Sequence, residues 1–97
     1  MKVSEIHIDL VKPSGGLVGF ASAVVDDKFY LGSIGIMKMI SGEFRLSYPT
    51  RKIGDEQFNV FYPINKKTGD EMSEAIITKL KEIVKYDDRY SSVIDTL

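Results

Sequence analysis

The adjacent cations Arg51 and Lys52 are the residues of this chain whose types and spacing best suit a binding function. A guanidinium can hold a phosphate or a guanine edge with two parallel hydrogen bonds, and a neighbouring ammonium adds a strongly hydrated point charge. Pro49 precedes the pair, and Gly54 and Asp55 follow it. Because these residues interrupt strands, we expect a short basic loop between two strands, the usual arrangement for a binding loop. The alternative is a solvated loop whose charges are merely tolerated.

A second pair of cations, Lys66 and Lys67, lies shortly before a predicted helix. It extends the candidate nucleic-acid-binding set to Arg51, Lys52, Lys66 and Lys67, although lysines at such positions are also common as simple solvation. Aromatic residues in the neighbouring strands could stack on unpaired bases, but alternating aromatics more often pack in a core. We expect at least half of the following to be buried: Phe44, Tyr48, Phe58, Phe61 and Tyr62.

The sequence contains no arrangement typical of catalysis or metal binding. His7 is the one histidine and cysteine is absent, which excludes His clusters and thiolate metal sites. Asp26 and Asp27 suit a tight turn better than general acid–base catalysis, because the side chains of adjacent residues on a β-turn point away from each other. Gly32 and Gly35 are not followed by the strand-to-helix switch of a phosphate-binding loop. We therefore expect no enzyme, no cofactor, no metal and no small-molecule substrate.

Alternation of apolar and polar residues predicts the strands that would position the basic loop. Turns are predicted at residues 13–16, where two glycines can take positive φ, and at Asp26 and Asp27. Gly32 and Gly35, inside the third strand, indicate a bulge or a close backbone approach. The predicted strands, joined as a largely antiparallel meander, are residues 3–11, 17–25, 28–36, 43–48 and 57–62.

One helix is predicted after Lys67. Thr68 and Glu71 have the spacing of a capping box, in which the threonine hydroxyl accepts the amide hydrogen of the third helical residue. The small apolar residues at 17–25 predict a central strand that this helix covers. An apolar stripe at helical spacing should pack on the sheet, and it consists of Met72, Ala75, Ile76, Leu80, Ile83 and Val84.

The 97 residues suffice for one domain with a modest core and are too few for two. We place this domain at residues 1–86 and a tail at 87–97, where Tyr90, Val93, Ile94 and Leu97 either form a last helical turn or fray. The absence of cysteine, of an apolar leader and of a membrane-length stretch favours a cytoplasmic protein. Because the net charge is −1, any nucleic-acid affinity must come from local patches.

Several spaced motifs match one known family. Residues 42–52, GEFRLSYPTRK, follow a G-x-F-x-x-x-P-S-R/K-K/R segment, and residues 62–65, YPIN, follow an H-P-I-N segment. Residues 3–8 echo the family's first strand, and residues 21–27 match its A-x-V/I-x-hydrophobic-D-D/E strand. On these residues the chain resembles the bacterial stage V sporulation protein G (SpoVG) family over residues 3–84.

The resemblance implies a small dimeric α+β regulator that binds DNA, and in some members RNA, and that influences septation, sporulation or gene expression. It also implies DNA contact by the basic pair, here Arg51 and Lys52. His7 and Asp9 stand where the family's first strand usually carries arginines, and Tyr62 replaces its usual histidine. These departures keep the apolar alternation, so the expected fold is unchanged. They leave fewer basic residues than a typical member of the family has.

Sequence and resemblance together predict an α+β fold: a mostly antiparallel sheet of about five strands with a C-terminal helix packed against it, forming a homodimer. The expected partners are DNA or RNA and a second copy of the chain, with no membrane. The alternative function is a protein-interaction module in cell division or septation that does not bind nucleic acid. The negative net charge and the missing first-strand arginines favour that alternative.

Overall fold

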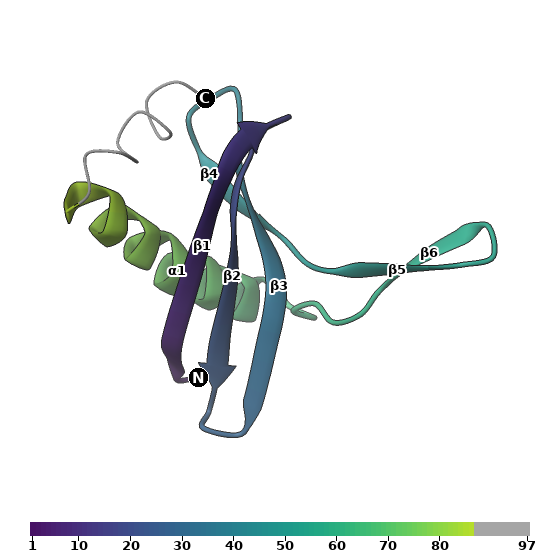
Figure 1. The fold of residues 1–97 in the computed structure, drawn as a ribbon. Helices are drawn as coiled ribbons and strands as arrows, with labels where there is room; N and C mark the ends of the chain where they lie inside the picture. Colours follow the sequence, from purple (N-terminus) through teal and green to yellow (C-terminus); the bar gives the residue numbers. More distant parts are fainter. Residues whose placement is uncertain (87–97) are drawn as a thin grey trace.

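The computed structural model describes residues 1–86, which form six strands and one helix (Figure 1). The α+β fold with a C-terminal helix is confirmed, but the strands form two sheets, of four and two strands, where the sequence predicts one sheet of about five. The predicted tail at 87–97 lies outside the described residues. The elements are β1 (Val3–Ser14), β2 (Leu17–Val25), β3 (Phe29–Lys38), β4 (Phe44–Ser47), β5 (Thr50–Ile53), β6 (Glu56–Asn59) and α1 (Lys66–Tyr86).

The larger sheet is an antiparallel meander with strand order β1-β2-β3-β4. Its first two turns are those that the sequence predicts. Gly15 and Gly16 have φ angles of +59° and +91°, and Asp26 and Asp27 have φ angles of +53° and +56°. Glycine reaches such angles without strain, and aspartate tolerates them better than most residues, so the local sequence specifies both reversals.

A bulge interrupts the pairing of β2 with β3, as the glycines of that strand indicate. Gly32 and Ser33 of β3 lie opposite the single residue Ser22 of β2. Ser33 takes a φ of +59° to accommodate the extra residue. Bulges of this kind bend a strand and increase its twist, so β3 curves along its length.

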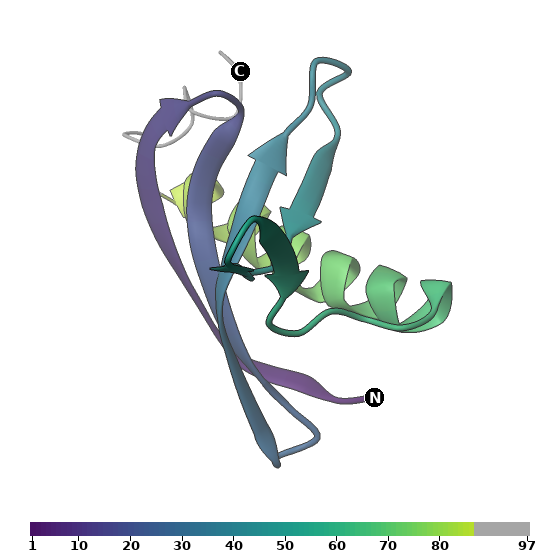
Figure 2. The same cartoon turned by 90° about the vertical axis from the view of Figure 1, so that its right-hand side faces the viewer.

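Helix α1 covers one face of the larger sheet and completes the core (Figures 1 and 2). The predicted stripe is the buried face of this helix, because Ile76 and Leu80 are 0% exposed and Met72 is 2% exposed. On the sheet, Ala21 of β2 is buried in the same cluster as these helix residues, while the helix backbone lies nearest to the edge strands β1 and β4. Full burial of an Ile or Leu side chain contributes about 1.5–3 kcal/mol, so this layer dominates stability.

Asn65, and not Thr68, caps helix α1. The Asn65 Oδ1 atom accepts a hydrogen bond of 2.8 Å from the Thr68 backbone N–H. The Asn65 carbonyl oxygen accepts a second bond of 3.1 Å from the Gly69 N–H. The predicted capping box at Thr68 and Glu71 is therefore wrong: Thr68 is the third residue of the helix and receives the cap.

Candidate nucleic-acid interface

Strands β5 and β6 form a separate antiparallel hairpin that projects from the larger sheet (Figures 1 and 2). We call residues 50–59 the arm. Every residue of its two strands is exposed. The strands are joined by a two-residue turn that begins at Gly54, whose φ is +61°. The arm is thus held together by its own cross-strand hydrogen bonds, outside the core.

An aromatic pair connects the arm to the core. The rings of Tyr48 and Phe61 meet edge to face, with centroids 5.9 Å apart and an interplanar angle of 77°. Both side chains pack against the core cluster. Just beyond them, the Val60 N–H donates a hydrogen bond of 2.8 Å to the Pro49 carbonyl oxygen. The core therefore fixes the base of the arm.

Arg51 and Lys52 lie within strand β5, so the prediction that they form a short basic loop between two strands is wrong. The predicted strand at 57–62 is β6, which covers residues 56–59 and pairs with β5. Successive side chains of a strand point to opposite faces. Arg51 and Lys52 therefore lie on opposite faces of the arm and do not form one patch.

The face of the arm that carries Lys52 is polar throughout. Lys52 pairs with Gln57 across the hairpin, and Thr50 pairs with Asn59. The Gln57 side-chain amide donates a hydrogen bond of 3.2 Å to the Thr50 Oγ1 atom. We call this surface, formed by these four residues, the polar face.

The opposite face of the arm is largely apolar. Arg51 pairs with Phe58, and Ile53 pairs with Glu56. Val60, two residues beyond Phe58, extends this surface toward the base. Ile53 is 58% exposed, Phe58 47% and Val60 61%. We call this surface, with Arg51 and Glu56 at its edges, the apolar face.

The predicted cations differ in their ionic partners. Arg51, Lys52 and Lys67 make no ion pair with any carboxylate within residues 1–86. Lys66, in contrast, donates a hydrogen bond of 2.6 Å from its Nζ atom to Asp70 Oδ2. This hydrogen bond and the attraction of the carboxylate raise the pKa of Lys66. Three of the four predicted cations are therefore free to attract an external anion.

The first turn of α1 contains Lys66 and Lys67 and no acidic residue. A helix N-terminus carries a partial positive charge, so lysines there are electrostatically unfavourable. The Asp70 carboxylate partly offsets this cost for Lys66. The two lysines lie on a different element from the arm.

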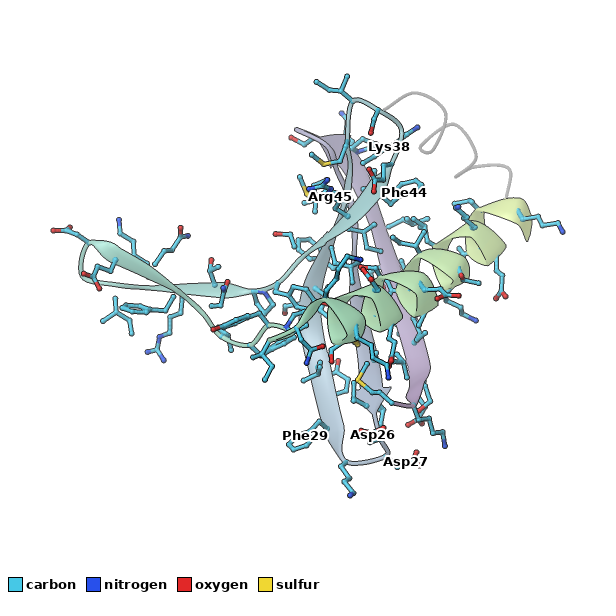
Figure 3. All side chains as sticks on the ribbon, turned by 180° about the vertical axis from the view of Figure 1, so that it is seen from behind. Asp26, Asp27, Phe29, Lys38, Phe44 and Arg45 are labelled. Atoms are coloured by element: carbon cyan, nitrogen blue, oxygen red, sulfur yellow. The ribbon has the colours of Figure 1, made fainter. Side chains whose placement is uncertain are left out.

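A groove of about 860 Å³ between β4 and α1 adds cations that the sequence reasoning missed. Arg45, Lys66 and Lys81 line it, together with the carboxylates of Glu43 and Asp70. Figure 3 shows Arg45 close to Phe44 on β4. No sequence signal marks Arg45, because a lone arginine in an alternating strand is ordinary. Only the packing of the helix beside β4 brings it near the two lysines.

The aromatic residues divide between core and surface. Phe44, Tyr48 and Phe61 are partly buried and pack against the core cluster. Phe58 and Tyr62 are 47% and 56% exposed. The sequence predicts that at least half of the five are buried. Three of the five are partly buried and none is fully buried, so the prediction is only partly correct. Phe58 is the one of the five that lies on the arm.

The remaining polar residues singled out in the sequence have local roles. His7 is an exposed strand residue whose Nε2 lies 3.2 Å from Asp9 Oδ1. Asp26 Oδ1 accepts a hydrogen bond of 2.7 Å from the Lys2 N–H, and Asp27 pairs with the Lys2 ammonium at 3.1 Å. Within residues 1–86 no three histidine or acidic side chains gather as metal ligands would, and no helix has the length and apolarity to cross a membrane.

The fold and the arm define a small α+β domain with an exposed, charged β-ribbon. The family model of SpoVG matches residues 1–82. The chain therefore belongs to the SpoVG family.

Relatives from several bacteria match most of the chain, and each carries the name "Putative septation protein SpoVG". The protein of Agathobacter rectalis is 28% identical over 82 residues, covering 84% of this chain and 93% of the relative. That of Caldicellulosiruptor bescii is 27% identical over 85 residues, covering 87% and 96%. That of Treponema denticola is 26% identical over 78 residues, covering 79% and 83%. The match thus extends over nearly the whole length of these relatives.

Proposed function

We propose that this chain is a cytoplasmic regulator that acts as a homodimer, binds DNA or RNA, and influences septation, sporulation or gene expression. Membership of the SpoVG family and the names of the relatives support the link to septation. The observation that carries nucleic-acid binding is the arm. It exposes two cations that have no carboxylate partner within residues 1–86.

The polar face of the arm suits a nucleic-acid surface. The major groove of B-DNA admits a two-stranded β-ribbon, and lysine, glutamine and asparagine are among the side chains that read base edges there. Lys52, Gln57 and Asn59 occupy this face. The acidic residues Asp55 and Glu56 at the tip would repel phosphates. We therefore propose that the ribbon lies along the groove on its polar face and does not enter tip first.

The other cations contribute from separate surfaces. Lys66 and Lys67 at the start of α1 would meet the phosphate backbone, with Arg45 and Lys81 of the adjoining groove. Arg51 points away from the polar face, so it cannot touch the same phosphates as Lys52 of its own subunit. Its charge would assist binding only at longer range.

A fluorescence anisotropy titration against duplex DNA and RNA fragments at two salt concentrations tests this proposal. For duplex DNA, each lost phosphate contact should lower the slope of log affinity against log salt by about 0.9. Lys52→Ala and Lys67→Ala should each weaken binding and lower the slope. Lys28→Ala, which removes the same charge at the distant turn between β2 and β3, serves as the control. Equal affinities and slopes for all three variants would contradict the proposal.

A protein-interaction module without nucleic-acid binding is the second candidate function. The exposed apolar face of the arm favours it, because contiguous exposed apolar surface commonly marks a protein contact. The net charge of −1 also favours it. The same titration separates the two candidates: absence of binding at low salt would leave the interaction module as the better account.

A further inference from the structure

The apolar face of the arm is a surface that an isolated chain leaves without a partner. Ile53, Phe58 and Val60 are each about half exposed or more on a hairpin whose strands are exposed throughout. An isolated two-stranded hairpin is marginally stable in water, and it gains stability when its apolar face is covered. Within an isolated chain, the apolar face of the arm therefore lacks the covering surface that would stabilise the hairpin.

The charges at the edges of the apolar face are self-complementary. Arg51 and Glu56 lie on this face in adjacent cross-strand pairs, diagonally across the hairpin. Within residues 1–86 neither takes part in an ion pair. A twofold axis that lies in the plane of the contact, along the Ile53–Phe58 diagonal, would bring Arg51 of each arm near Glu56 of the partner subunit. One face therefore supplies both the cation and the anion that a second copy of the same face requires.

We propose that the apolar face packs against the same face of a second copy of the chain, with Arg51 opposite Glu56 of the partner subunit. This inference rests on the homodimer proposed above and names the surface that forms it. Such a contact is isologous, the form that closes a dimer without further growth. It buries Ile53 and Phe58 in both arms. It also leaves the two polar faces on the outside, where each Lys52 remains accessible.

Charge reversal across the proposed contact provides a direct test. Arg51→Glu gives an apolar face with two acidic residues, and Glu56→Arg gives one with two basic residues. Like charges facing each other across an interface strongly disfavour association. Each single variant should therefore weaken dimerisation by more than about tenfold, as measured by sedimentation equilibrium at micromolar concentration. Lys52→Glu, a charge reversal on the polar face, should leave the dimer unchanged.

Two further experiments, in which dimerisation should be recovered, exclude misfolding as the reason why the single variants fail to dimerise. An equimolar mixture of Arg51→Glu and Glu56→Arg proteins should form a heterodimer, visible by native mass spectrometry. The double variant Arg51→Glu with Glu56→Arg should again form a homodimer. Single variants that dimerise like the parent, or a mixture that stays monomeric, would overturn the arm contact while leaving the homodimer standing. A parent protein that is monomeric at all concentrations would overturn the homodimer itself.

Discussion

The larger sheet and the arm are both β-structures with apolar side chains, but many of these side chains are buried in the larger sheet, whereas those of the arm are exposed. Both are antiparallel, and each includes a strand that alternates apolar with polar residues, β1 in the larger sheet and β6 in the arm. In β2 the apolar set includes Val18 and Ala21, at 0% and 2% exposure, beneath helix α1. In the arm the corresponding residues Ile53 and Phe58 are exposed. Alternation therefore shows that a segment has an apolar face, and the helix decides whether that face is covered within the chain.

This difference predicts that the larger sheet provides stability and that the arm provides binding. The covered face of the larger sheet should carry most of the free energy of unfolding, because apolar burial is the dominant favourable contribution to folding. The arm should contribute little to stability and should carry the contacts with partners. Substitutions in the two regions test this division.

Leu80→Ala should have the largest effect on folding. Leu80 is 0% exposed at the centre of the buried helix stripe, and removing such a side chain leaves a cavity. We expect a loss of about 2–5 kcal/mol in the free energy of unfolding. Urea denaturation followed by circular dichroism would measure it. An unchanged midpoint would show that the helix does not hold the core together.

Asn65→Ala should have the next largest effect. The substitution removes the side-chain hydrogen bond to the Thr68 N–H at the start of α1. Loss of a helix N-cap costs about 1 kcal/mol. Thr68→Ala serves as the matched control, since its hydroxyl makes no such cap in the structure. If Thr68→Ala proved the more destabilising, the helix would begin at Thr68, as the capping-box pattern predicts.

Tyr48→Phe should slightly stabilise the protein. Within residues 1–86 the buried Tyr48 hydroxyl has no hydrogen-bond partner, and burial raises the pKa of this phenol above its ordinary value of 10.0. Removing an unsatisfied buried group should add up to about 1 kcal/mol. Because the unfolded chain releases the Tyr48 proton first as pH rises above 10.0, the parent should lose stability there. The variant should lack this part of the alkaline loss in denaturation curves at pH 9 and above.

Ile53→Ser should have the smallest effect on folding of the four. Ile53 is 58% exposed on the apolar face of the arm. Exposed substitutions change stability by less than about 0.5 kcal/mol. The denaturation curve, measured at a concentration where the chain is monomeric, should overlay that of the parent. A loss comparable with that of Leu80→Ala would mean that the arm belongs to the core.

The sequence predicts the parts of the fold that local chemistry specifies. The turns at Gly15 and Asp26 require positive φ. Glycine and aspartate are among the residues that tolerate such angles, so both turns can be predicted from the sequence. The helix stripe from Met72 to Val84 follows from its 3.6-residue period. The helix start is harder to predict, because Asn65 and Thr68 are both good caps. In the structure the Asn65 side chain makes the cap.

The candidate site was predictable in composition and not in arrangement. Arg51 and Lys52 are neighbours in sequence, which suggests one patch if they lie in a loop and two opposite faces if they lie in a strand. The residues Pro49 and Gly54 fit either a loop or a short strand between turns. Alternation at 57–62 likewise cannot reveal whether that strand pairs with β4 or with β5. These choices depend on cross-strand partners, which no single segment encodes.

Replacement of the arm by a short turn would separate the binding role of the arm from the stability of the larger sheet. Pro49 and Val60 are already joined by a backbone hydrogen bond, so two glycines could connect them in place of residues 50–59. The deletion removes Arg51 and Lys52 together with Asp55 and Glu56, so the net charge stays at −1. We expect a shortened chain that folds with a stability close to that of the parent, measured under monomeric conditions, and that neither dimerises nor binds nucleic acid. A shortened chain that fails to fold, or that dimerises and binds as the parent does, would contradict this expectation.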